Sequence, residues 1–206
     1  MSTHTHISSP PWRLKGKGYI FVYSFSKHKL DSHFTSLDYL GGLTLLMLVD
    51  YSESNIGPYH EMLLIPGKSR FNGITGYHIS HIHVSTEIST INGRANWGIP
   101  KTTLPFQVDE GLRNWRIGDS SDVQVRPTSL QLPVFTHFLP YQLIQQLNET
   151  VYKLRPSAWG TAGLAKLDNF NSDLPGFELL NNEKPLIGLY ANKFHLTFPN
   201  PKTFKA

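Results

Sequence analysis

The hydrophobic and polar pattern of the chain consists mainly of short segments rich in β-branched and aromatic residues, separated by glycines and prolines. Such segments are typical of β-strands. Three dipeptides between them, Pro66-Gly67, Asn72-Gly73 and Asn92-Gly93, have the composition of turns. The predicted strands are Gly18–Phe25, Leu43–Val49, Tyr59–Ile65, Tyr77–Ile88, Thr103–Val108, Asn114–Ile117, Val123–Arg126 and Leu186–Phe198.

Helical patterns are scarcer. The best candidate is Tyr141–Leu154, in which Leu143, Leu147, Val151 and Leu154 recur at helical spacing after a proline. A second, shorter candidate is Leu30–Leu40. The sequence therefore predicts one α+β domain, spanning residues 1–206. We expect mostly antiparallel strands that form a cone-like or barrel-like closed sheet, with a few flanking helices.

The segment His81–Ile88 alternates strictly between two kinds of residue. Odd positions carry polar side chains, beginning with His81 and His83, and even positions carry Ile82, Val84 and other less polar residues. This alternation indicates a strand with one wall in the core and the other facing water or a lined cavity.

Length and composition agree with a single globular domain. The chain has 206 residues, of which 39% are hydrophobic and 12% aromatic, which is enough for one sizeable core. Only 17% of the residues are charged. Cysteine is absent, which excludes disulfide scaffolds, cysteine-ligated zinc, iron–sulfur clusters and thiol catalysis.

The net charge of +4 is small for this length, and the basic residues are scattered along the chain. A nucleic-acid partner would call for a continuous basic stripe with interleaved aromatics, so none is expected. The N-terminal residues lack the apolar core of a signal peptide, and the longest apolar run, Leu43–Val49, is far too short to span a membrane. We therefore expect a cytoplasmic protein with no membrane partner.

The segment Asn92–Phe106 carries the most informative chemistry. Lys101 follows Trp97, Gly98, Ile99 and Pro100, so an amine comes directly after an apolar turn that the proline stiffens. Apolar neighbours would desolvate the ammonium and lower its pKa, as a lysine that forms a Schiff base requires. An exposed turn lysine is the common alternative for such a pattern.

This segment resembles the active-site signature of the acetoacetate decarboxylase superfamily, which places Gly-Arg a few residues before Pro-Lys. Here the matching pairs are Gly93-Arg94 and Pro100-Lys101. Gly57–Gly67 resembles the glutamate-bearing strand of that superfamily. Pro10–Tyr23 and Phe194–Pro201 resemble the first and last strands of its small members, so the resemblance spans most of the chain in order.

The resemblance implies roles for individual residues. Lys101 would condense with the carbonyl of a small keto substrate, and the imine would accept the electrons released by decarboxylation or by a related aldol, dehydration or cyclisation step. Glu61 would position the substrate or move a proton. Arg94 would be a nearby cation, and substrate contacts are expected from Tyr59, Trp97 and Thr102. No metal or cofactor is expected, and the family's habit of forming oligomers allows a homo-oligomer.

The chain departs from the family pattern at three positions. Thr102 stands where well-studied decarboxylases have a second lysine, Leu43–Val49 lacks their second pocket glutamate, and Gly16 stands where they have an N-terminal arginine. Burial alone can lower the pKa of a lysine by up to about five, so the missing lysine is not decisive. A pocket with fewer charges favours a larger, more apolar ketone.

Two other functional interpretations stay open. The same cavity could serve a non-catalytic small-molecule binding protein, or an enzyme without covalent catalysis, such as a cyclase that relies on Glu61.

Two further groups of residues carry side chains that could form a site. His81 and His83 lie about 7 Å apart on one predicted strand face, but His78 points to the other, and a catalytic zinc needs three converging ligands. No metal site is therefore predicted. The alternating aromatics Tyr19 and Phe21, with Tyr23 beyond them, could line a ligand wall, but burial within the sheet is the favoured interpretation.

Overall fold

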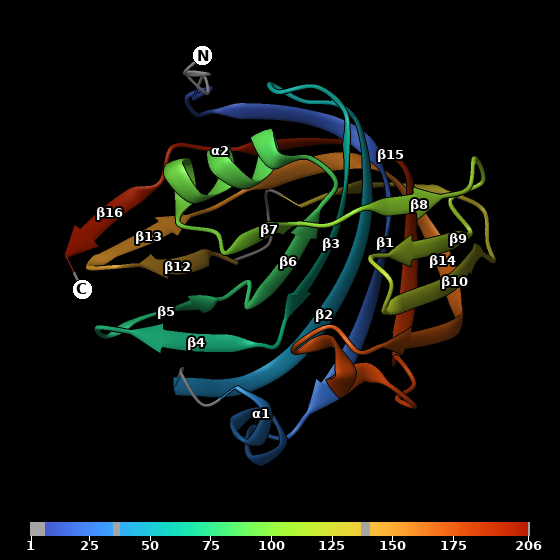
Figure 1. Ribbon diagram of the computed structural model, residues 1–206, viewed down its shortest axis with the longest axis horizontal. Helices are drawn as coiled ribbons and strands as arrows, with labels where there is room; N and C mark the ends of the chain where they lie inside the picture. Colours follow the sequence, from blue (N-terminus) through green and yellow to red (C-terminus); the bar gives the residue numbers. More distant parts are fainter. Residues whose placement is uncertain (1–6, 35–37, 137–140, 206) are drawn as a thin grey trace.

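The computed structural model describes residues 7–34, 38–136 and 141–205. Strands dominate this part of the chain, which also contains two α-helices and one short 3-10 helix (Figure 1). The elements are β1 (Trp12–Phe25), α1 (Lys27–His33), β2 (Asp38–Glu53), β3 (Tyr59–Ile65), β4 (Lys68–Phe71), β5 (Ile74–Tyr77), β6 (His81–Val84), α2 (Glu87–Trp97), β7 (Lys101–Thr103), β8 (Phe106–Val108), β9 (Asn114–Ile117), β10 (Ser121–Pro127), β11 (Leu132–Phe135), β12 (Leu143–Leu147), β13 (Thr150–Leu154), β14 (Ser157–Ser172), η1 (Phe177–Leu180), β15 (Ile187–Phe198) and β16 (Lys202–Lys205).

The strands form one large, mostly antiparallel sheet. Its main path runs β16-β13-β12-β5-β4-β2-β1-β15-β14-β10-β9-β8, and β3, β6 and β7 branch from β2 in that order. The β6–β7 and β5–β12 pairs are parallel. The predicted α+β, mostly antiparallel architecture is confirmed, but the pairings among the described residues leave the path open at β16 and β8. Closure of the sheet into a barrel is therefore not confirmed.

Two cores lie on opposite faces of the central strands. On β3, Met62 and Leu64 face the first, which we call the Trp115 core, whereas Leu63 and Ile65 face the second, the Trp97 core. The buried members of the Trp115 core are Tyr19, Phe21, Tyr23, Leu30, Phe34, Tyr39, Leu46, Leu48, Met62, Leu64, Leu112, Trp115, Ile117, Val123, Val125, Phe177, Leu179, Leu180 and Tyr190. Those of the Trp97 core are Trp12, Leu14, Val49, Tyr51, Tyr59, Leu63, Ile65, Ile79, Ile82, Val84, Trp97, Ile99, Leu143 and Leu154.

The predicted helix Tyr141–Leu154 is wrong. This segment forms the hairpin of β12 and β13, and Asn148 turns the chain between them with a φ of 53°. Asparagine tolerates this left-handed conformation better than most residues. The three leucines and Val151 are spaced by three or four residues, which fits a helix, but the same spacing also fits two short strands. Pairing with other strands of the sheet favours the hairpin.

The second predicted helix, Leu30–Leu40, is only partly correct. The helix α1 begins earlier and ends at His33, and Asp38 already belongs to β2. The N-terminal boundary follows a local signal, because the Ser26 hydroxyl accepts a hydrogen bond from the Lys29 amide as a helix cap. Residues 35–37 of the prediction lie outside the described residues.

The predicted strand Tyr77–Ile88 is too long, and the predicted turn at Asn92-Gly93 is wrong. The strand β6 ends at Val84, and Asn92-Gly93 lies inside α2. Gly98 ends this helix in the left-handed conformation, with a φ of 64°. The buried face of α2 includes serine, asparagine and glycine, so its sequence has little of the apolar periodicity that predicts a helix.

The other predicted strands each overlap an observed strand, although Thr103–Val108 is divided between β7 and β8. The turns at Pro66-Gly67 and Asn72-Gly73 are confirmed, because they separate β3 from β4 and β4 from β5. The longest strand that was not predicted is β14, whose many alanines, glycines and asparagines have low β-propensity. None of the described helices has the length and hydropathy that crossing a lipid bilayer requires.

Candidate active site

The branch of the sheet formed by β3, β6 and β7 places the predicted catalytic residues on one face. Glu61 of β3 pairs with Val84 of β6, and Ile82 of β6 pairs with Lys101, the first residue of β7. Side chains alternate between the two faces along a strand and share a face across paired strands. Glu61 and Lys101 therefore both point into the side of the sheet that holds the Trp97 core.

The helix α2 covers this face in Figure 1, lying against β7. It presents Ser89 and Gly93, one turn apart, to the Lys101 side chain. A Cβ on Gly93 would lie 2.6 Å from the Cδ of Lys101, so only glycine leaves room there for the lysine stem. The spacing from Gly93 to Lys101 therefore has a packing reason: the missing side chain at Gly93 of α2 leaves the space that the Lys101 side chain of β7 occupies.

The Lys101 amine is held by three side chains, two from β3 and one from α2. Its Nζ donates to Glu61 Oε2 at 2.9 Å and to Ser89 Oγ at 3.0 Å, and it lies 3.5 Å from the Tyr59 hydroxyl. The Tyr51 hydroxyl donates to the other carboxylate oxygen, Glu61 Oε1, at 3.4 Å. The ion pair is sealed from solvent, because the Lys101 and Glu61 side chains are each only 5% exposed.

The expected lowering of the Lys101 pKa is wrong for this geometry. Burial acts to lower the pKa, but the Glu61 carboxylate, the Tyr59 hydroxyl and their hydrogen bonds outweigh it, and the pKa is raised above 10.5. Burial raises the pKa of Tyr59 to about 12, and that of Tyr51 well above 10.0 with a contribution from Glu61. Lys101 is thus an ammonium at neutral pH, and both tyrosines keep their hydroxyl protons.

The remaining predicted site residues do not reach the amine. Trp97 is buried in the Trp97 core, where its ring packs against Trp12 and its indole nitrogen donates to the Pro199 carbonyl at 2.8 Å. The exposed Arg94 donates from Nε to the main-chain carbonyl of Lys101 at 2.8 Å, so it fixes the backbone and not the ammonium.

Thr102 lies on the opposite face of the sheet from Lys101. Its hydroxyl is 2.6 Å from His83 Nδ1. The alternation of side chains along β7 therefore places Thr102 away from the amine, and its expected contact with substrate stays a prediction.

Sequence reasoning missed Ser89 and Tyr51. The Ser89 hydroxyl contacts the amine and also hydrogen-bonds Tyr59. Its available signal was its position four residues before Gly93, which places both on one helix face. The sequence instead predicted a strand that ends at Ile88 and a turn at Asn92-Gly93. Tyr51 pairs with Tyr59 across β2 and β3, so extending the predicted strand beyond Val49 would have found it.

His81 and His83 share one face of β6, the face opposite Lys101, and both of their rings lie near Phe177. In the described parts of the chain, no three histidine, aspartate or glutamate side chains converge as metal ligands.

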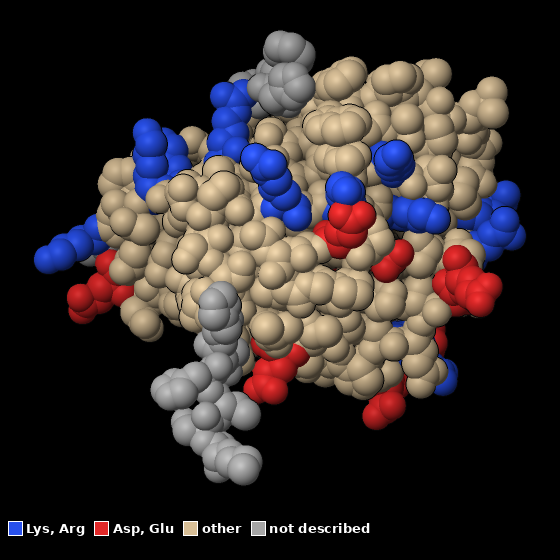
Figure 2. Space-filling model, turned by 90° about the horizontal axis from the view of Figure 1, so that it is seen from above, with Lys and Arg blue, Asp and Glu red and all other residues tan. Residues whose placement is uncertain are grey.

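Tyr19 and Tyr23, with Phe21 between them, are buried in the Trp115 core. The basic residues on the face seen in Figure 2 are mostly single side chains with uncharged surface between them.

Two cavities lie away from the ion pair. The larger, of about 670 Å³, is an open polar depression over β8, β9 and β10. The smaller, of about 350 Å³, lies beside Pro100, the residue before Lys101. Neither cavity has Lys101 or Glu61 among the described residues that line it.

Comparison with known proteins identifies the fold. No protein-family model and no curated protein matches the sequence. Among solved structures, acetoacetate decarboxylase from Legionella pneumophila subsp. pneumophila str. Philadelphia 1 is similar, with a TM-score of 0.65 and 17% identity over 95% of this chain and 88% of that one. An acetoacetate decarboxylase-like enzyme from Sphingomonas wittichii RW1 has a TM-score of 0.66 and 12% identity over 97% and 95% of the two chains.

A third similar structure is the enduracididine biosynthesis enzyme MppR complexed with pyruvate, with a TM-score of 0.62 and 13% identity over 96% of this chain and 91% of that one. All three resemble this chain over nearly its full length. The chain therefore has the fold of acetoacetate decarboxylase and its relatives, as the sequence resemblance implies.

Proposed function

We propose that this protein is a lyase-type enzyme that forms a Schiff base between Lys101 and a small keto substrate. The observation that carries the proposal is the buried pair of Lys101 and Glu61, with a nitrogen–oxygen distance of 2.9 Å, on a fold shared with acetoacetate decarboxylase and its relatives. A lysine sealed in an apolar core costs considerable desolvation energy, and such groups are concentrated at functional sites.

The proposed chemistry begins with proton transfer from the Lys101 ammonium to Glu61, which leaves a neutral amine. The amine attacks the substrate carbonyl, and loss of water from the carbinolamine gives the imine. Once protonated, the imine accepts the electron pair of the breaking bond, which releases carbon dioxide if the substrate is a β-keto acid. Tyr59 and Ser89, which contact the amine nitrogen, would hold it in position while protons move.

Borohydride trapping tests this proposal directly. The protein is incubated with acetoacetate, pyruvate or 2,4-pentanedione, reduced, digested and analysed by peptide mass spectrometry. We expect the reduced adduct on Lys101 with at least one of these ketones. The Lys68→Met variant, which removes an exposed lysine of β4, should retain the adduct. Adducts spread over surface lysines, with none on Lys101, would contradict the proposal.

Trapping should become faster as the pH rises from 7 to 10. The pKa of Lys101 is raised, so the attacking neutral amine becomes more abundant throughout this interval. The initial rate of adduct formation, measured at fixed ketone concentration by intact-protein mass spectrometry, gives the profile. A rate that is already maximal near pH 7 would mean that the amine is neutral in the folded protein, against the geometry described above.

A second candidate function is a non-catalytic small-molecule binding protein. The same observation that complicates catalysis favours it: the ammonium is stabilised by Glu61, which keeps it from acting as a nucleophile. This candidate predicts that a ketone raises the thermal midpoint of unfolding, while borohydride leaves no adduct on Lys101.

A further inference from the structure

The segment that precedes β1 contacts α2, the helix that covers the Lys101 amine. In Figure 1 the chain enters β1 beside α2. Ser8 bonds to this helix although 84 positions separate it from Asn92 in the sequence. The contact therefore joins the beginning of the described chain to the cover of the candidate active site.

Both main-chain polar groups of Ser8 bond to α2. The Ser8 N–H donates to Asn92 Oδ1 at 2.8 Å, and the Ser8 carbonyl accepts from Asn96 Nδ2 at 2.8 Å. The same carbonyl accepts from Trp12 Nε1 at 2.8 Å, which connects Ser8 to the first residue of β1. Ser8 thus links the helix to the sheet, and we call residues 7–11 the N-terminal strap.

The strap holds the face of α2 that contacts the lysine. Ser89, Asn92 and Asn96 recur at spacings of three and four, which place them along one side of the helix. Ser89 contacts the Lys101 amine at 3.0 Å. Asn92 is fully buried, and its Nδ2 donates to the backbone of α2 at 2.9 Å, so its amide presents the oxygen to the strap. The helix therefore cannot move away from Lys101 without stretching the bonds to the strap.

The strand beneath the amine is held more firmly than the helix above it. The strand β3, which carries Tyr59 and Glu61, pairs with β2 on one side and with β6 on the other. The helix has no such ladder on either side, and besides the strap it is held by side chains such as those of Thr90 and Trp97. Local opening costs less free energy in elements with few such bonds than in central strands. Opening of α2 is therefore the least costly way to uncover the amine.

We propose that the N-terminal strap regulates access to the Lys101 amine, because its bonds from Ser8 hold α2 closed and their release lets the helix open to a small molecule. The Lys101 side chain is only 5% exposed, so the rate at which its amine meets a reagent depends on how often the cover opens. The importance of this device rests on the proposed function, in which the amine is the nucleophile, but the strap itself can be tested without a ketone.

Trace labelling with acetic anhydride measures the opening directly. The Asn96→Ala variant removes the donor to the Ser8 carbonyl, and alanine is the better helix former, so the helix itself is not weakened. We expect acetylation of Lys101, measured by peptide mass spectrometry relative to the exposed Lys68, to become about two- to tenfold faster, as the loss of one hydrogen bond implies. Deletion of residues 1–8 removes both bonds from Ser8 to α2 and should accelerate it by about tenfold or more.

The matched control is Asn55→Ala. The Asn55 side chain accepts a hydrogen bond from the Arg13 N–H of β1 at 3.0 Å, so this variant also removes an asparagine bonded to the N-terminal backbone. Asn55 lies between β2 and β3 and not on α2, so Lys101 acetylation should be unchanged. Equal acceleration in Asn55→Ala and Asn96→Ala would overturn the proposal, as would unchanged acetylation in both Asn96→Ala and the deletion variant.

Hydrogen exchange distinguishes opening of the helix from unfolding of the whole domain. In Asn96→Ala the amides of α2 should exchange faster, whereas those of Leu63 and Leu64 in β3 should keep the rates of the unmodified protein. Equal acceleration in α2 and β3 would mean that the domain unfolds as a unit, which contradicts a strap that acts on the helix.

Failure of the strap can be distinguished from failure of the imine proposal by adding the borohydride experiment to the same variants. Faster acetylation together with faster trapping of a ketone on Lys101 supports both proposals. Faster acetylation with no ketone adduct on Lys101 supports the strap and contradicts the imine. A ketone adduct on Lys101 with unchanged acetylation in the variants supports the imine and overturns the strap.

Discussion

Replacing Lys101 by methionine is expected to lower the free energy of unfolding by about 3–5 kcal/mol, the usual cost of removing one member of a buried ion pair. The loss arises because Glu61 would remain in the core without its ammonium partner, with the Tyr51 hydroxyl still donating to its carboxylate. Urea denaturation at pH 7 measures the effect. Methionine keeps much of the volume of the lysine stem, so cavity formation contributes little.

The matched control is the double variant Lys101→Met/Glu61→Leu, which removes both charges. It should recover most of the lost stability, because the desolvation of two ions disappears along with their attraction. Equal destabilisation in the single and double variants would show that the two charges are not coupled in the folded protein.

The pH dependence of this coupling has a definite sign. The folded-state pKa of Lys101 lies above 10.5, so the stability that the pair contributes is fully present below pH 10.5 and is lost as the pH rises through the folded-state value. The stability difference between the unmodified protein and the double variant should therefore decrease in the alkaline range, as Lys101 loses its proton.

Replacing Trp97 by alanine is expected to cost about 3–5 kcal/mol of stability, the range observed for large aromatic residues in cores. Trp97 is 2% exposed, its ring contacts Trp12 and Phe198 at centroid distances of 5.1 and 4.9 Å, and its indole N–H bonds the Pro199 carbonyl. Its loss would leave a cavity where α2 packs against β1 and β15.

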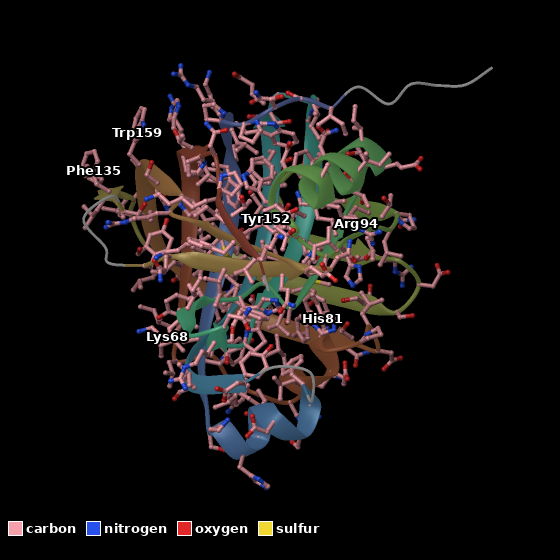
Figure 3. All side chains as sticks on the ribbon, turned by 90° about the vertical axis from the view of Figure 1, so that its left-hand side faces the viewer. Lys68, His81, Arg94, Phe135, Tyr152 and Trp159 are labelled. Atoms are coloured by element: carbon pink, nitrogen blue, oxygen red, sulfur yellow. The ribbon has the colours of Figure 1, made fainter. Side chains whose placement is uncertain are left out.

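The control for this prediction is Trp159→Ala, which removes a tryptophan on the surface of β14. Figure 3 shows Trp159 near Phe135 at the outer edge of the molecule, and Trp159 is 51% exposed. Its removal should cost less than about 1 kcal/mol. Comparable losses for both tryptophans in urea denaturation would contradict the assignment of the Trp97 loss to its buried contacts.

The sequence predicted those parts of the fold in which local pattern and burial agree. Tyr59–Ile65 was found because a run of long apolar residues, Met62 to Ile65, suits a strand buried on both faces. Tyr141–Leu154 was wrong because leucines at helical spacing also fit a hairpin, and only the pairing of β13 with β16 and of β12 with β5 distinguishes the two.

For the site, sequence identified the ionisable pair and missed its surroundings. Glu61 and Lys101 were found as separate motifs 40 residues apart, and the structure brings them together across one intervening strand. The charge state of Lys101 could not be predicted, because it depends on the 2.9 Å contact and not on the apolar residues that precede it in sequence. Ser89 belongs to a helix whose polar inner face gave no periodic signal.

The alternation of side chains on β7 has a consequence for how this protein relates to enzymes with two adjacent lysines. A cation introduced at position 102 would lie beside His83, with the sheet between it and Glu61. The electric field of this cation would reach the Lys101 amine only through the backbone of the sheet. Arg94 already donates a hydrogen bond to the Lys101 carbonyl in that layer. The surroundings of the Lys101 amine are therefore set by Ser89 and Tyr59, which lie on its own side of the sheet, and not by the neighbouring residue in sequence.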